Sequence, residues 1–405
     1  MKKIVRNSYL FVLFFVFLES LSAWFTWDMS NLLTIVFVFV TIFYILVFRK
    51  ELNLSANLLP ISIFLIAVFG LGFAKDLSNA LGLICKFFPV LVFLTTPRAF
   101  KIYALNVITR WWLFILIPSL GLFLLSFFID LPNLGQIENK NWEMYVYTNY
   151  IFFIKGQFYD IRFNSIFLEP GHLGMILAFF LYAFKFDLTK WQVWTMLVVE
   201  FFTLSLAGYV LVAIAYIFSL IVQRKSFLKF ILYVSLFLGS VFAGAKLYND
   251  GDNLLNVLIV DRLQLDDEKG IVGNNRTSTA ADDLFEEVIT SSKIWWGVPE
   301  GMYKNENLGA GWQVFTIKFG LIPLILFALF YLLLANKRPI DSRYNMLFVA
   351  LLAIAFLQRA YPFWESWIIP FVSGMSFKFL GQSDNRLFSI QNKEQLSKVK
   401  QIKSI

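Results

Sequence analysis

Long uninterrupted runs of apolar residues dominate the chain, and short polar segments separate them. A helix needs roughly 20 apolar residues to cross a bilayer, and about twelve runs reach or approach this length. The predicted membrane-spanning helices cover residues 8–24, 30–48, 58–73, 77–95, 111–129, 170–186, 190–205, 207–222, 227–245, 311–335, 345–360 and 362–380. The pattern predicts a single all-α integral membrane domain over residues 1–405.

The positions of the basic side chains predict which side of the membrane each loop occupies. Cytoplasmic loops are enriched in Lys and Arg, and such residues flank the connection after every even-numbered predicted helix and fill the tail 381–405. We therefore expect both termini inside, and two long outer loops at 130–169 and 246–310. Loops of this length commonly carry function. The first apolar run is also compatible with a cleaved signal peptide, which would remove only the first span.

Composition narrows the functional classes. Of the 405 residues 59% are hydrophobic, and the net charge of +8 comes from residues at helix ends, so we expect no nucleic-acid partner. The single cysteine, Cys85, allows neither a disulfide framework nor a CxxC site. Asp250-Gly251-Asp252 has the form of a DxD metal motif but is typical of an ordinary turn, so we expect no metal and no other cofactor.

The most informative segment, residues 162–174, enters the sixth predicted helix. Pro170 suits the first position of a helix, which places Glu169 at its N-terminus, where free N–H groups and the helix dipole favour an anion. Glu169 can serve as a general base for a sugar hydroxyl. Alternatively, it only caps the helix and pairs with Arg162. His172, the only histidine, is either a structural residue or a second candidate for the base.

Five cations are predicted on the outer side, and Arg262 is the one among them without a specific role. Arg162, Arg276 and Arg359 can bind a diphosphate through a planar fork of hydrogen bonds, and Lys318 can add charge. Arg359 is notable because a charge inside a predicted span is costly unless it faces a cavity or a partner. The alternatives are loop exposure for Arg276, and snorkelling or pairing with Glu365 for Arg359.

These motifs resemble the Wzy-type O-antigen polymerase family and, more broadly, the superfamily that includes O-antigen ligases. The resemblance rests on the Arg-x-x-Ser-x-Phe-x-Glu-Pro-x-x-x-Gly pattern from Arg162 to Gly174 and on the segment 204–209, LSLAGY. It also rests on Asn275-Arg276 and Trp296-Gly297 in the second outer loop. Family membership implies a GT-C-like transferase that uses an undecaprenyl-diphosphate-linked glycan, needs no metal, and binds the diphosphate through Arg162 and Arg276.

The resemblance leads to an expected function. The chain would polymerise lipid-linked repeat units of an O-antigen, capsule or exopolysaccharide at the outer face of a bacterial inner membrane. A flippase and a chain-length regulator are possible partners. A ligase-like transferase is the first alternative, but ligases carry an essential histidine in or after the second long outer loop, and His172 is the only histidine here. A transporter would spread charge to the bilayer midplane, whereas the charges within the predicted spans lie in their outer halves: Glu19, Glu200, Lys318, Arg359 and Glu365.

Overall fold

The structure is a computed structural model of the full chain. It describes residues 1–27, 31–73, 77–139, 146–156, 161–223, 279–303, 311–336 and 342–376, with scattered residues between 235 and 271. Most of these residues are helical, and several helices are apolar enough to cross a membrane, which confirms the helical membrane class.

The helices have the following bounds: α1 Lys2–Ser20, α2 Asn31–Phe48, α3 Leu54–Phe73, α4 Leu77–Thr95, α5 Arg98–Leu125, α6 Pro170–Ala183, α7 Trp191–Thr203, α8 Leu206–Gln223, α10 Thr279–Ile289, α11 Trp312–Phe319, α12 Leu321–Asn336, α13 Ser342–Phe356 and α14 Glu365–Gly374. Short 3-10 turns lie at η1 Trp24–Thr26, η5 Ser292–Trp295 and η6 Glu300–Met302. The strands are β1 Gln136–Glu138, β2 Val146–Asn149, β3 Ile154–Gly156, β4 Leu265–Asp266 and β5 Gly270–Ile271.

Fewer described helices reach spanning length than the sequence predicted. Four helices are long and apolar enough to cross a membrane: α3, α4, α5 and α8. The pair α11 and α12 makes a fifth if it is one span, whereas α2, α6 and α13 are apolar but shorter. The predicted span 227–245 lies almost wholly outside the described residues, as does the tail 381–405.

The predicted continuous span 311–335 is broken. Helices α11 and α12 are bent by 120° at Gly320, whose φ of +77° only glycine adopts easily. A side chain at Gly320 would lie 2.4 Å from the backbone of Trp295. Gly297 fits in the same way against the backbone of Lys318. Hydrophobic periodicity missed the break because the contact that requires it comes from another segment.

The predicted cytoplasmic connection 96–110 is mostly helix. Helix α5 starts at Arg98 and runs for 28 residues, so Arg98 and Lys101 lie on its first turn. Lys101 is buried, and its Nζ donates a hydrogen bond of 2.6 Å to the carbonyl oxygen of Leu94 near the end of α4. A lysine can thus be placed inside a packed bundle when a helix C-terminus supplies an acceptor.

The predicted outer loop 130–169 contains a small sheet that the sequence did not indicate. Strands β1, β2 and β3 pair antiparallel in that order, with Tyr147 opposite Ile137 and Gly156. The hydroxyl of Tyr147 donates a hydrogen bond of 2.8 Å to the carbonyl of Leu168. The sheet therefore helps to fix the chain immediately before Glu169.

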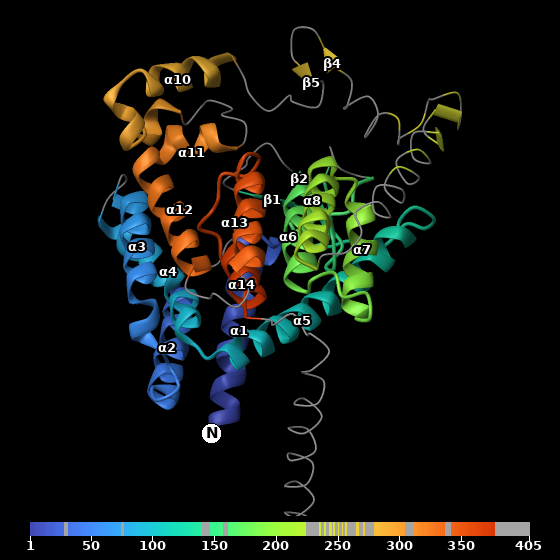
Figure 1. Cartoon of the computed structure of the whole chain (residues 1–405). Coiled ribbons are helices and arrows are strands. Elements are labelled where there is room, and N and C mark those ends of the chain that lie inside the picture. The colour runs from blue at the N-terminus through green and yellow to red at the C-terminus, as the bar shows by residue number, and fades with distance from the viewer. Residues whose placement is uncertain are drawn as a thin grey trace, which may run out of the picture.

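Helix α6 forms the centre of the bundle. In Figure 1, α2, α3, α4 and α12 lie to one side, α7 and α8 to the other, and α1, α13 and α14 between them. Helix α5 crosses from one group to the other at the end where the N-terminus lies, and α10 and α11 lie at the opposite end. Every residue of α6 from His172 to Ala183 is buried, as expected for a helix that is apolar on all sides.

Candidate functional site at the N-terminus of helix α6

Glu169 is the N-cap residue of α6, as predicted. Its backbone is extended, with φ −139° and ψ 142°, and Pro170 occupies the first helical position. The Glu169 carbonyl accepts hydrogen bonds from the backbone N–H groups of His172 and Leu173. The carboxylate makes no capping hydrogen bond, so simple side-chain capping does not describe this residue. Its side chain is directed to another part of the chain.

The carboxylate of Glu169 forms an ion pair with Arg359. Arg359 Nη2 donates to Glu169 Oε2 across 190 positions of sequence. The side chains are 12% exposed for Arg359 and 19% for Glu169, so the pair is largely buried but can still be reached. The sequence predicted neither partner: Arg162 was the alternative for Glu169, and Glu365 was the alternative for Arg359. Glu365 instead lies close to Lys86 and Glu19.

Gly171 provides the space for the guanidinium of Arg359. A Cβ added to this glycine would lie 2.7 Å from Arg359 Nη2 and 3.8 Å from Ser205 Oγ. The first turn of α6, the connection between α13 and α14, and the hairpin between α7 and α8 therefore meet at one point. Ser205 belongs to the hairpin segment noted in the sequence, but no role was predicted for it.

The hairpin between α7 and α8 also contacts Arg162. Arg162 Nε donates a hydrogen bond of 3.3 Å to the carbonyl of Thr203, two residues before Ser205. Leu204 has a φ of +47°, and Ser205 Oγ accepts a hydrogen bond of 3.2 Å from the backbone N–H of Gly208. Arg162 thus contacts the hairpin whose Ser205 approaches Gly171 and Arg359, and the two arginines offer forked donors that suit an anionic ligand.

Several motif residues before Glu169 hold the backbone in place. Ser165 has a φ of +55°, and its hydroxyl accepts a hydrogen bond of 2.9 Å from Ser119 of α5. The amide of Asn164 donates a hydrogen bond of 2.6 Å to the carbonyl of Phe167, whose ring is fully buried. Phe167 also forms a β-bridge with Ala23. Ser165 and Phe167 are therefore explained by structure and need no contact with a ligand.

His172 lies on the first turn of α6 and is 5% exposed. Its ring meets the ring of Trp364 edge to face at 5.1 Å, and Trp364 stacks on Tyr361 at 4.4 Å. Burial raises the pKa of the Tyr361 phenol, while the charge of Arg359 lowers it and that of Glu169 raises it. Tyr361 therefore lies close to both charges of the pair. These contacts favour a structural role for His172 and identify Tyr361 as an aromatic wall of the site.

Glu200 lies below the site and was noted in the sequence only as one of several outer-half charges. Its carboxylate fits where α6 and α8 approach closely: a Cβ on Gly174 would lie 3.0 Å from Glu200 Oε1, and one on Gly208 2.3 Å from it. Glu200 is 3% exposed, and neither carboxylate oxygen has a hydrogen-bond partner within the described part of the chain. Gly174 and Gly208, which belong to the two sequence motifs that resemble the family, are therefore required for α6 and α8 to cross this closely around Glu200.

The remaining candidates lie elsewhere. Lys318 is on α11, where its Nζ lies 5.2 Å from the ring centre of Tyr303. Arg276 lies outside the described residues, which in the predicted outer loop 246–310 are 279–303 and a few scattered positions before them. Across the described ranges, no three His, Cys, Asp or Glu side chains come together in a way that could hold a metal ion.

An apolar groove lies beside the arginine-bearing connection. Its cavity of about 170 Å³ lies between α12, α13 and α14. Phe356 and Pro362, three residues to either side of Arg359, both line it. The Tyr331 hydroxyl donates a hydrogen bond of 2.6 Å to the Pro362 carbonyl at the same place. The apolar groove therefore lies next to the connection that carries Arg359.

Comparison with known proteins identifies no relative: no protein-family model, no curated protein and no solved structure matches this chain significantly.

Proposed function

We propose that the protein polymerises lipid-linked glycan repeat units, in the manner of the Wzy-type family that its motifs resemble. The observation that carries the proposal is the Glu169–Arg359 ion pair at the N-terminus of α6, with Arg162 hydrogen-bonded to the hairpin between α7 and α8. A carboxylate provides a base for a sugar hydroxyl, and arginines provide the forked donors that bind phosphate groups. The apolar groove near Arg359 suits the lipid part of such a substrate.

In the proposed reaction, Arg162, Arg359 and Arg276 bind the diphosphate of an undecaprenyl-diphosphate-linked glycan. The acceptor hydroxyl attacks the anomeric carbon, a new glycosidic C–O bond forms, and the bond from that carbon to the lipid diphosphate breaks. Glu169 takes the proton of the hydroxyl, and the arginines stabilise the charge of the leaving diphosphate. Lys318 would add positive charge along the path of the substrate, and His172 would position the first turn of α6.

The proposal places the protein in a bacterial inner membrane, with about twelve spans, both termini inside, and Glu169 facing outward. The structure offers exposed positions to test this arrangement in a Cys85→Ser background: Asn133 in the first predicted outer loop and Lys50 after α2. A cysteine at Asn133 should react with an impermeant thiol reagent in intact cells, whereas one at Lys50 should react only after permeabilisation. The reverse pattern would contradict the orientation.

The activity itself is tested in a deletion strain that carries the gene on a plasmid. The wild-type gene should restore a ladder of long polysaccharide. Glu169→Gln should leave the protein level unchanged while single lipid-linked repeat units accumulate. A normal ladder at a normal protein level would rule out Glu169 as the base. The operon is a second check, because neighbouring sugar transferases and a flippase are expected there.

A transporter is the second candidate, and one observation favours it. Lys86 of α4 pairs with Glu19 of α1 at 2.9 Å, and the buried Glu365 of α14 lies close to both. Charges among packed helices are a feature of ion and substrate pathways. A transporter would fail to export its glycan in a Lys86→Met strain, whereas a polymerase with the same change would still make polymer in proportion to its folded protein.

A further inference from the structure

The Glu169–Arg359 ion pair places two proposed roles in conflict. A base must have a free carboxylate, and a phosphate-binding arginine must have a free guanidinium, but these two side chains bind each other. A cation at hydrogen-bond distance stabilises the charged carboxylate and makes it a weaker base. The described state therefore represents a site that is not yet ready to react.

The ion pair neutralises two largely buried charges when no ligand is bound. Arg359 lies three residues after the end of α13, and Glu169 at the entrance to the fully buried helix α6, so an unpaired charge on either would be costly. Each side chain neutralises the other. The exposure of 12% and 19% leaves the pair open enough for an anion from outside to compete.

We propose, on the basis of the polymerase function proposed above, that the diphosphate of the donor displaces the Glu169 carboxylate from Arg359. Glu169 then becomes a free base only when the donor is already bound. Arg359 exchanges one anionic partner for another and stays paired throughout. The released carboxylate lies next to a bound anion, and like charge raises the pKa of a carboxyl group, which makes it a stronger base. Donor binding must therefore precede deprotonation of the acceptor.

The structure also identifies what allows the exchange. Gly171 leaves the guanidinium lying directly on the first turn of α6, because a Cβ there would come within 2.7 Å of Arg359 Nη2. The guanidinium can remain in this place while the carboxylate rotates away from it. Ser205 Oγ, close to the same point, offers a hydroxyl to the incoming phosphate.

The exchange is tested by binding inorganic pyrophosphate to the full-length protein in lipid nanodiscs, measured by calorimetry. Glu169→Gln removes the internal competitor and should bind pyrophosphate at least about fivefold tighter than wild type, because fivefold is the upper end for exposed ion pairs and this pair is largely buried. Arg359→Lys should bind more weakly than wild type. The matched control is Glu19→Gln, which removes a carboxylate from the other ion pair, with Lys86, and should leave the affinity unchanged.

Equal or weaker binding by Glu169→Gln would overturn the exchange. If that variant is unstable on size-exclusion chromatography, Glu169→Asp replaces it: the shorter side chain weakens the pair, and an affinity no higher than wild type would overturn the proposal. No binding by any form would overturn both the exchange and the diphosphate site. If Glu169→Gln has unchanged affinity but makes no polymer, the exchange is contradicted and Glu169 remains the proposed base. If it binds pyrophosphate more tightly but makes a normal ladder, the exchange is supported and Glu169 is not the base.

Discussion

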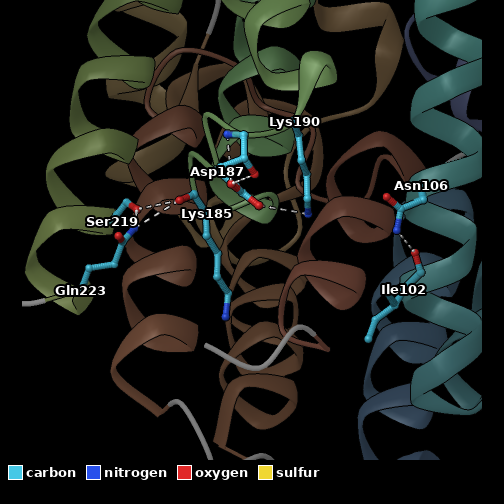
Figure 2. A network of polar contacts seen from close by, with 8 residues as sticks. Ile102, Asn106, Lys185, Asp187, Lys190, Ser219 and Gln223 are labelled. Carbon is cyan, nitrogen blue, oxygen red and sulfur yellow. Dashed lines mark hydrogen bonds and ion pairs between the residues drawn. The ribbon is translucent and has the colours of Figure 1, made fainter. Parts of the chain in front are cut away.

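The two ends of helix α6 carry polar residues of different kinds. At the N-terminal end, Glu169 pairs with Arg359 across 190 positions of sequence. At the C-terminal end, the Thr189 hydroxyl donates a 2.6 Å hydrogen bond to Asp187, and Lys190 lies 3.6 Å from the same carboxyl group. Figure 2 shows this second network, in which Ser219 and Gln223 donate to the carbonyl of Lys185.

The polar residues at the C-terminal end of α6 complete a turn, whereas those at its N-terminal end form a candidate site. Asp187, Thr189 and Lys190 are sequence neighbours that satisfy the groups of their own turn, and the Asp187 side chain is 39% exposed. The N-terminal pair holds two distant segments against each other and places two charges beside an apolar helix. Such buried charges cost free energy, so their presence indicates a function beyond stability. We therefore expect substitutions at the N-terminal end to affect activity, and those at the C-terminal end to affect only stability.

The largest expected effect is on activity, from Glu169→Gln. If Glu169 is the proposed general base, its loss should lower the rate of the proposed polymerisation by about 10²-fold to 10⁴-fold, since glutamine cannot accept the proton. The rate is measured as repeat units joined per minute in membranes supplied with lipid-linked substrate. Asp187→Asn is the matched control and should polymerise normally. Equal loss in both variants would mean that the two ends do not differ in function.

Arg359→Lys should lower the polymerisation rate by about tenfold, because lysine keeps the charge but lacks the planar fork that binds a diphosphate at two points. Lys190→Arg makes the opposite exchange at the other end and should leave the rate unchanged. A dose–response with donor locates the effect: weaker donor binding should raise KM. Full activity of Arg359→Lys would show that Arg359 contributes only charge.

A substitution where α6 and α8 cross, at Gly174 and Gly208, tests helix packing next to the proposed site. Gly208→Ala would place a Cβ 2.3 Å from Glu200 Oε1 and 3.1 Å from the Cα of Gly174. We expect a loss of about 2 kcal/mol in the free energy of unfolding, measured by thermal or denaturant unfolding in detergent. Gly121→Ala in α5, where a Cβ meets nothing within 4 Å, is the control. Alanine there should be neutral or stabilise by about 0.5 kcal/mol. Similar results for both glycines would contradict the close crossing.

The smallest effect belongs to the C-terminal turn and depends on pH. Burial alone would raise the pKa of Asp187, but the hydrogen bonds from Thr189 and the charge of Lys190 together lower it. A carboxyl group with a lowered pKa in the folded state stabilises the protein at neutral pH and loses this contribution as the pH falls below about 4. Asp187→Asn should therefore cost less than about 1 kcal/mol at pH 7, since the side chain is exposed.

The pH dependence is measured by unfolding wild type and Asp187→Asn over a series of pH values. The stability difference between the two proteins should shrink towards zero between neutral pH and pH below about 4. The polymer ladder should be unchanged at every pH where both proteins are folded. A difference that grew as the pH fell would show that the pKa of Asp187 is raised, not lowered.

The sequence predicted helices better than it predicted their interruptions. The long apolar runs correspond to α2, α3, α4 and α8 within a few residues, because crossing a bilayer requires a minimum number of consecutive apolar residues. The predicted unbroken span at Gly320 was wrong, because the break there depends on a contact with another segment, at Trp295. Helix α5 begins at Arg98, well before the predicted span 111–129. The small sheet before Glu169 gave no signal, because its strands are only three or four residues long.

The sequence by itself determined that this is a helical membrane protein and that Glu169 begins a helix, because apolar run length and the Glu-Pro step are local properties. The tertiary structure alone decided that Arg359 is the partner of Glu169, that Gly171 makes room for it, and that Glu200 lies between Gly174 and Gly208. Charges along one chain can pair in many ways, and only the packing of α6 against α8 and α14 selects the pair that forms.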